Sequence, residues 1–176
     1  MNRIVNWVNS FDVSLFQFIN HNLKCRFFDF TLSKITHLGG ATITLSTLTG
    51  LLFISGQTLR TWTLQALLSL IISHIIVHII KKIYRRERPY ETLNSVHLGA
   101  NPLKDYSFPS GHTTAIFSVT VVFALHSAML AMILLPIAIL VGFSRLYLGV
   151  HYPTDVIVGA SIGILTATII VFQFSF

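Results

Sequence analysis

The stretch PSGHTTAIFSVTVVFAL, residues 109–125, joins a proline–glycine turn carrying one histidine to an apolar run without a charged side chain. The run ends at a break near His126 and Ser127, and a second apolar run, residues 128–141, follows it. One unbroken helix from His112 to Arg145 would be about 50 Å long at 1.5 Å per residue, against about 30 Å of membrane hydrocarbon. We therefore expect two antiparallel helices.

Composition predicts an integral membrane protein. Of the 176 residues, 53% are hydrophobic and 10% are charged, and the mean hydropathy is +0.72. Three more segments, residues 41–54, 62–80 and 156–174, approach the roughly 20 apolar residues that a spanning helix needs. Lipid offers no hydrogen-bond partners to backbone N–H and C=O groups, so these groups must pair within the chain. We therefore expect an all-α helical bundle of five to six transmembrane helices. No nucleic-acid partner is expected.

The N-terminal region, residues 1–35, differs from the rest of the chain. Apolar residues recur there at helical spacing between polar ones, which is typical of an amphipathic helix lying at the membrane interface. A sixth span is the alternative. No secretory signal peptide is recognisable, and the single cysteine, Cys25, excludes an intrachain disulfide. The apolar stripe consists of Ile4, Val8, Phe11, Leu15, Phe18 and Ile19, with Asn6, Asn9, Asp12, Gln17 and Asn20 between them.

The net charge of +6 is concentrated in the longest polar interval, residues 81–109. A concentrated cationic site favours an anionic ligand. A basic patch attracted to anionic lipid head groups is the alternative, and we prefer it for Lys82, Arg85 and Arg86.

Lys81 and Arg88 are interpreted differently. Seven residues on a helix return to nearly the same face, about 10 Å further along, so both side chains could reach one pocket. Pro89 is expected to end that helix and to favour an extended backbone at Arg88. The Arg88 guanidinium could then bind two phosphate oxygens at once, in a bidentate contact.

Ser110, Gly111 and His112 stand where the helix of residues 113–125 begins. Glycine permits close backbone approach, and the free N–H groups of a helix N-terminus favour an anion. The alternative is a serine that only caps the helix. His112 adds a titratable group to a site suited to phosphate.

A second candidate histidine and, after Arg88, a second candidate arginine lie between residues 141 and 156, which we expect to form a short connection. Asp155 could accept a hydrogen bond from Nδ1–H of His151, which would leave Nε2 free as a nucleophile. The alternative is that Asp155 caps the last helix, a role compatible with holding His151. Ser144 and Arg145 precede this pair.

Taken together, three motifs occur in a fixed order: Lys81, six residues, then Arg88 and Pro89; Pro109-Ser110-Gly111-His112; and Ser144-Arg145, five residues, His151, three residues, then Asp155. This pattern resembles the type-2 phosphatidic acid phosphatase superfamily, over residues 62–174. The same phosphate site occurs in vanadium haloperoxidases, but those proteins are large and mostly soluble, and this chain is small and apolar.

The resemblance implies a metal-independent phosphomonoesterase or diphosphatase that acts through a phosphohistidine, without a cofactor. In this sequence it implies that His151 attacks phosphorus, that Asp155 orients His151, and that His112 protonates the leaving oxygen. The implied phosphate-binding groups are Lys81, Arg88, Ser110, the Gly111 amide and Arg145.

Substrate class follows from position, because the site lies at helix ends where a lipid head group would be. We expect one membrane phosphatase domain, residues 1–176, acting on a phosphorylated lipid. Undecaprenyl diphosphate, phosphatidylglycerophosphate, phosphatidic acid and lipid A all fit the motifs, and the choice between monoester and diphosphate stays open. A non-catalytic lipid-phosphate-binding or transport protein is the alternative.

The expected location is the bacterial cell membrane. Basic residues crowd the active-site side, whereas little beyond Arg60 lies opposite, so a positive-inside count would put the site in the cytoplasm. The family resemblance implies the outer face. We prefer the outer face, because Lys81, Arg88 and Arg145 are accounted for by the substrate.

Two smaller features complete the sequence expectations. His74 and His78 lie one helical turn apart, and we interpret them as polar contacts within the membrane, with a metal site as the alternative. Gly39 with Gly40, and Gly159 with Gly163, are expected to mark close helix contacts, within one chain or between chains.

Overall fold

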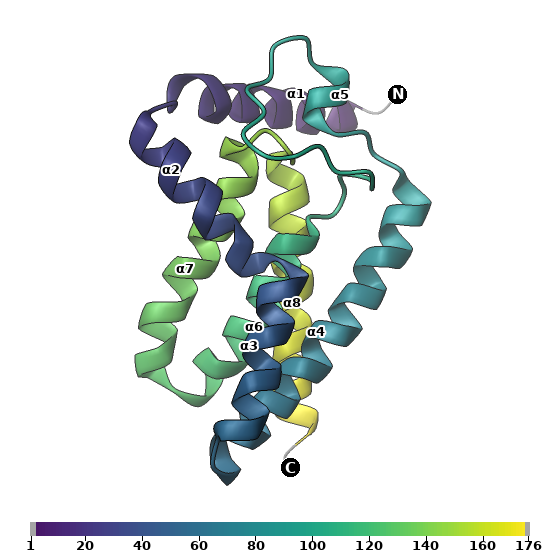
Figure 1. Ribbon diagram of the computed structural model, residues 1–176. Helices are drawn as coiled ribbons and strands as arrows, with labels where there is room; N and C mark the ends of the chain where they lie inside the picture. The colour runs from purple at the N-terminus through teal and green to yellow at the C-terminus, as the bar shows by residue number, and fades with distance from the viewer. Residues whose placement is uncertain (1–2, 175–176) are drawn as a thin grey trace.

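The protein is a bundle of helices with no strand in residues 3–174, the range that the computed structural model describes (Figure 1). The two terminal positions at each end of the expected 1–176 domain lie outside that range. In chain order the elements are α1 (Arg3–Gln17), the π-helical turn η1 (Phe18–Asn22), α2 (Arg26–Ile35), the 3₁₀ turn η2 (Thr36–Gly39), α3 (Ala41–Ile54), α4 (Gln57–Tyr84), α5 (Pro89–Thr92), α6 (Gly111–His126), α7 (Ala128–Tyr147) and α8 (Pro153–Gln173).

Helix α6 is the centre of the bundle and packs against α4, α7 and α8. Two glycines of α8 allow its closest approach to α6. A Cβ on Gly163 would lie 2.8 Å from the Ser118 nitrogen and from the Thr114 oxygen, and a Cβ on Gly159 would lie 2.7 Å from the Ser110 oxygen. The expected close contacts at these glycines are thus confirmed, within one chain.

The hairpin expected between residues 113–125 and 128–141 is present as α6 and α7. Ser127 has extended backbone angles, φ −148° and ψ 115°, and its side chain accepts a hydrogen bond from the Leu130 amide. The expected end of the second helix is wrong. Helix α7 continues to Tyr147, so Ser144 and Arg145 occupy its last turn instead of a connecting loop.

Helix α4 also differs from the expectation at its end. It stops at Arg85, which has the left-handed angles φ 43° and ψ 39°, four residues before the proline that was expected to stop it. Pro89 instead begins α5, while Arg88 has the extended backbone that was expected. Lys81 and Arg88 therefore do not share a helix face.

Three helices in the described range are long and apolar enough to cross a membrane: α4 with its continuation to Thr92, α7 and α8. The segments Arg26–Gly39 and Ala41–Ile54 pass the same test as a pair, bent by 57° at Gly40, whereas α6 is apolar but has only 16 residues. One face of α4 is apolar and exposed, which fits contact with lipid; it carries Ile71, Ile75, Ile79 and Ile83.

Helix α1 lies across the end of the bundle, at the top of Figure 1. Its inner face buries Asp12 and Phe16 completely, while Trp7 and Phe11 are exposed. Asp12 and Asn20, which the sequence pattern assigned to a polar face, are thus internal. The side chain of Ile4 lies outside the described part of the structure.

Candidate active site

The three motifs meet at the end of the bundle that α1 covers. Helix α4 brings one of the expected residues, the α4–α5 connection one, the N-terminus of α6 three, the last turn of α7 one, and the α7–α8 connection with the first turn of α8 two. Six of the expected side chains are buried, and Gly111 and His112 are partly buried. The buried six are Lys81, Arg88, Ser110, Arg145, His151 and Asp155.

His151 and Asp155 form the centre of the site. Nδ1 of His151 lies 3.5 Å from Oδ2 of Asp155, which is longer than a normal hydrogen bond, and 3.4 Å from the hydroxyl of Ser107. The Ser107 hydroxyl itself donates to Oδ2 of Asp155. Asp155 also caps α8, because Oδ2 accepts a hydrogen bond from the Tyr152 amide at 2.8 Å. The capping interpretation of Asp155 is therefore confirmed, whereas Asp155 approaches Nδ1 of His151 without the short hydrogen bond that was expected.

The environment of His151 favours a neutral imidazole. Burial lowers its pKa to about 3, and the positive charges of Arg145 and Arg88 act in the same direction, whereas Asp155 opposes them. Nη1 of Arg88 lies 3.2 Å from Nε2 of His151. If that N–H donates, Nε2 carries the lone pair and Nδ1 carries the proton, which is the tautomer that a nucleophilic Nε2 requires.

Lys81 and Arg88 converge on one carboxylate that the sequence analysis did not single out. Asp105 accepts from Nζ of Lys81 at 2.8 Å and from Nη2 of Arg88 at 2.7 Å. Burial alone would raise the pKa of Asp105, but the hydrogen bonds and charges of Lys81 and Arg88 lower it to about 2. The two residues thus reach a common point, as expected, although by a loop geometry and not along one helix.

The N-terminus of α6 carries the second motif. The Ser110 side chain caps the helix by accepting from the Thr113 amide at 3.4 Å and from the Thr113 hydroxyl at 2.9 Å. A Cβ on Gly111 would meet no atom within 4 Å, so the space next to its amide is open. The imidazole of His112 makes no hydrogen bond within residues 3–174 and lies beside two cavities. Open space and free donors at a helix N-terminus suit an anion.

Arg145 has an unused donor. Its Nη1 donates to the Thr36 hydroxyl at 2.6 Å, but its Nε is buried without a hydrogen-bond partner in the described part of the chain. An unpaired buried N–H is costly, and a bound phosphate oxygen would satisfy it.

Two cavities meet at His112. The polar cavity, about 540 Å³, is lined by Thr36, His37, Asn101 and Arg145 among others. The lateral cavity, about 570 Å³, lies between the start of α3 and α4 and runs from Lys81 and Asp105 down to exposed isoleucines of α4. The site is therefore reachable both from the loops and from the side of the bundle.

Arg86 belongs to the site and not to a lipid-binding patch, so the preferred interpretation of this residue was wrong. It donates from Nη1 to Oδ1 of Asp155 at 2.8 Å and from Nη2 to Oδ2 of Asp12 at 2.7 Å. Lys82 and Arg85, in contrast, are exposed. Asp12 and Ser107 also contact the site, and neither was predicted from the sequence. Asp105 and Ser107 stand just before the second motif in the sequence. Their closeness to that motif could have indicated that they lie near the site.

His74 and His78 line the lateral cavity. Nδ1 of His74 lies 3.0 Å from the Leu70 oxygen of its own helix, as the interpretation of a polar contact within the membrane expects. Within residues 3–174, no group of three or more His, Cys, Asp or Glu side chains is placed to hold a metal ion.

Comparison with known proteins identifies the family. A model of the PAP2 superfamily matches residues 62–176. The undecaprenyl-diphosphatase of Sulfolobus acidocaldarius is 32% identical over 163 residues, which cover 87% of this chain and 73% of that protein. The bacitracin transport permease protein BcrC of Bacillus licheniformis is 33% identical over 108 residues, and there the match spans about half of the relative, 53%.

Solved structures agree with this assignment. The crystal structure of Aquifex aeolicus LpxE matches with a TM-score of 0.84 and 29% identity, over 93% of this chain and 96% of that one. The crystal structure of a transmembrane PAP2 type phosphatidylglycerolphosphate phosphatase from Bacillus subtilis matches with a TM-score of 0.78 and 28% identity, over 94% of this chain and 85% of that one. The family model covers well over half of the chain, and all three motifs of the sequence lie within its range, so the chain belongs to the PAP2 superfamily.

Proposed function

We propose that the protein is a membrane lipid phosphatase, which removes a phosphate from a lipid monoester or diphosphate head group through a phosphohistidine at His151. The observation that carries this proposal is the contact between Arg88 and Nε2 of His151 at 3.2 Å, inside a buried site that also holds Lys81 and Arg145. Phosphoryl transfer depends mainly on in-line positioning and on fixed positive charge around the phosphoryl oxygens. Named relatives that act on lipid phosphates support the same reaction.

The proposed reaction has two steps. Nε2 of His151 forms a bond to phosphorus while the bond to the leaving oxygen breaks, and His112 gives its proton to that oxygen. Asp155 orients His151 and stabilises the positive charge that develops on it. Water then attacks the phosphohistidine, His112 takes the proton of the water, and inorganic phosphate and free His151 result.

The phosphoryl oxygens would bind the site cations together with the first amides of α6. Lys81, Arg88 and Arg145 supply three positive charges, and the Gly111 amide and the Ser110 hydroxyl supply neutral donors. In this proposal the three cations stabilise the negative charge on the phosphoryl oxygens, as a metal ion does in other phosphatases, so no metal and no cofactor are required.

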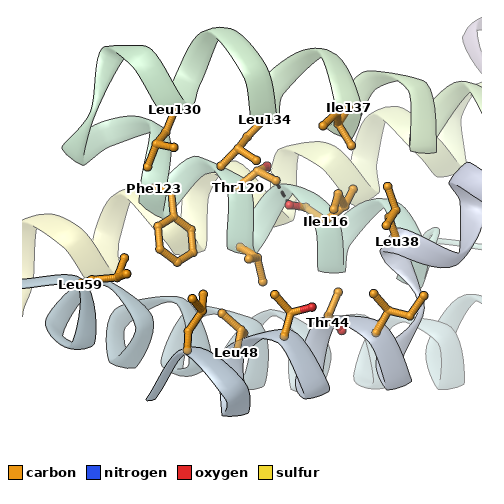
Figure 2. A pocket seen from close by; sticks show the side chains of 14 residues that line it. Leu38, Thr44, Leu48, Leu59, Ile116, Thr120, Phe123, Leu130, Leu134 and Ile137 are labelled. Carbon is orange, nitrogen blue, oxygen red and sulfur yellow. Dashed lines mark hydrogen bonds between the residues drawn. The ribbon is translucent and has the colours of Figure 1, made fainter. Parts of the chain in front are cut away.

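A lipid substrate fits the apolar surroundings of the site. The lateral cavity leads from Lys81 to the exposed isoleucines of α4, which gives a tail a path into the bilayer. A second, apolar cavity of about 410 Å³ lies against α6 between α3 and α7, with Leu48, Ile116, Phe123 and Leu134 around it (Figure 2). The apolar cavity suits a hydrocarbon chain, because its lining offers few polar partners, whereas the lateral cavity is polar near Lys81 and apolar toward the isoleucines of α4.

For the membrane arrangement we propose five spans. They are α4, α6, α7, α8 and the bent segment from α2 to α3, with α1 lying at the interface. The exposed Trp7, Phe11 and Phe18 of α1 and η1 would then face the head-group region, where aromatic side chains are favoured. A sixth span formed by α1 would have to expose its buried Asp12 contacts to lipid, which is costly.

For the location we propose the bacterial cell membrane, with the active site on the extracytoplasmic face. Cys25 provides a direct test, because it is the only cysteine, is exposed, and lies beside Tyr147 at the active-site end. A membrane-impermeant maleimide should label Cys25 in intact cells and should not label the Cys25→Ser control. Labelling only after the cells are opened would place the site inside.

The experiment that tests the proposed function is phosphate release by the purified protein in detergent with EDTA present. The substrates are undecaprenyl diphosphate, phosphatidylglycerophosphate, phosphatidic acid and a soluble phosphomonoester, and His151→Ala is the control. Release from at least one lipid, lost in His151→Ala, is expected. No release from any lipid would favour the alternative of a non-catalytic lipid-phosphate-binding or transport protein, and activity restored only by a divalent ion would contradict the metal-free mechanism.

A further inference from the structure

A buried ion network connects the N-terminal helix α1 to the candidate catalytic pair. Its members are Asp12 of α1, Arg86 of the α4–α5 connection, and Thr154 and Asp155 of α8. Arg86 bridges the two carboxylates with distances of 2.7 and 2.8 Å, and Asp12 also accepts from the Thr154 amide at 2.9 Å and from the Thr154 hydroxyl. Both carboxylate side chains are completely buried, whereas the Arg86 side chain is 25% exposed.

The Arg86 guanidinium is fixed in direction as well as in position. Its planar fork spans two carboxylates, and its central carbon lies 4.1 Å from the centre of the Tyr152 ring. The Tyr152 ring in turn packs against Phe16 of α1, with ring centres 5.7 Å apart. A guanidinium held on three sides has a single orientation, which a lysine could not reproduce.

That orientation determines how Asp155 faces His151. Oδ1 of Asp155 is occupied by Arg86, so the other oxygen, Oδ2, is the one that lies toward Nδ1 of His151 and the Ser107 hydroxyl. If Arg86 were absent, rotation of the carboxylate would be opposed only by the Tyr152 amide and the Ser107 hydroxyl. Partners that orient a functional side chain from behind commonly change activity by about 10- to 100-fold.

From these contacts we infer that Arg86 and Asp12 are positioning residues for the Asp155–His151 pair, and that α1 is required to keep Arg86 in place. The inference rests on the proposed function. It gives the N-terminal helix α1 a role in the reaction, although none of the three phosphatase motifs includes a residue of α1. The side-chain nitrogens of Arg86 donate to Asp12, Thr154 and Asp155, so Arg86 should affect the chemical step and not the binding of phosphate.

The test compares Asp12→Asn, Arg86→Lys and Arg86→Gln with Lys82→Gln, which removes a nearby exposed cation. For each purified protein, kcat and KM with a hydrolysed lipid, the inhibition constant of inorganic phosphate and the thermal unfolding midpoint are measured. We expect kcat to fall about 10-fold in Asp12→Asn and Arg86→Lys and about 100-fold in Arg86→Gln, with KM and the phosphate constant within about twofold of the wild type. Lys82→Gln should match the wild type.

A double-mutant cycle separates positioning from general damage. If Asp12 acts through Asp155, adding Asp12→Asn to Asp155→Asn should lower kcat no further, because the coupling has already been removed. Full additivity would contradict the inference. An unchanged kcat in folded Arg86→Lys and Asp12→Asn would also overturn it, as would a large rise in the phosphate inhibition constant, since that would make Arg86 a ligand contact.

These outcomes are distinguishable from failure of the proposed function. If the wild type and Lys82→Gln released no phosphate from any lipid, the proposed phosphatase activity itself would be wrong and the positioning role would fall with it. If both were active, only the behaviour of the Asp12 and Arg86 variants would decide the inference. Should Arg86→Gln fail to fold, Arg86→Lys and Asp12→Asn decide it alone.

Discussion

Arg88 donates a hydrogen bond from Nη2 to Oδ1 of Asp105 at 2.7 Å, while the other oxygen of the same carboxylate accepts from Lys81 at 2.8 Å. A carboxylate therefore neutralises part of the charge of two cations that the proposed mechanism assigns to phosphate. The Asp105 side chain is 57% exposed, so it can turn away toward solvent.

We predict that Asp105→Asn strengthens inhibition by inorganic phosphate. Removing one negative charge next to Lys81 and Arg88 should lower the inhibition constant about three- to tenfold, which corresponds to roughly 1 kcal/mol for a partly exposed site. Competition assays with inorganic phosphate measure this directly, with Glu87→Gln, an exposed carboxylate on the α4–α5 connection, as the control. Weaker inhibition in Asp105→Asn would mean that the carboxylate mainly holds the cations in position.

The loss of kcat in His112→Ala should depend on how strongly the leaving group needs a proton. With a lipid alcohol as the leaving group, His112→Ala should lose about 10²- to 10⁴-fold in kcat, the usual contribution of a general acid. With an aryl phosphate, whose leaving group is stable as an anion, the loss should be about tenfold or less. His126→Ala, at the other end of α6, is the matched control. Equal losses on both substrates would remove His112 from the role of proton donor.

The lowered pKa of His151 makes stability depend on pH. The pKa of an unperturbed histidine is 6.5, and burial lowers that of His151 to about 3 in the folded protein. Between these values the unfolded chain binds a proton that the folded chain does not, so the free energy of unfolding falls as the pH falls from about 6.5 toward about 3. Thermal unfolding at pH about 7 and about 5 should show a smaller decrease for His151→Gln than for the wild type. Identical decreases would argue against a buried neutral His151.

Packing between α6 and α8 should tolerate no added methyl group at Gly163. A Cβ there would lie 2.8 Å from backbone atoms of α6, and such overpacking typically costs about 1 to 3 kcal/mol. Gly163→Ala should therefore lower the thermal unfolding midpoint. Gly50→Ala is a suitable control, because a Cβ at Gly50 would meet no atom within 4 Å. Equal midpoints for the two variants would contradict the packing described for α8.

The sequence predicted the helical class, the α6–α7 hairpin and the convergence of the three motifs, because hydropathy and motif spacing are local signals. Helix ends were less predictable. The left-handed residue Arg85 ends α4 before Pro89, and neither charge nor hydropathy marks Arg85 as a stop. Arg145 was expected in a connecting loop but lies inside α7. The apolar pattern ends before the helix does, so hydropathy alone placed the helix end too early.

The polar contacts behind the motifs could not be predicted for a different reason. Arg86 finds its partners 69 and 74 residues away, at Asp155 and Asp12, and a charged residue in a sequence gives no information about what it faces after folding. The same holds for Asp12, which stands in an amphipathic pattern where a polar residue is ordinarily solvated. Only the three-dimensional arrangement reveals that it is buried.

The most direct test of the account is to trap the phosphoryl group on His151. Wild-type protein and His112→Ala are mixed with substrate, quenched at alkaline pH, where phosphohistidine is stable, and digested for mass spectrometry, with His151→Ala in parallel. We expect a phosphorylated peptide containing His151 in the first two samples and none in the third, which should also release no phosphate. Phosphate release by His151→Ala, or a phosphoryl group found on another residue, would contradict it.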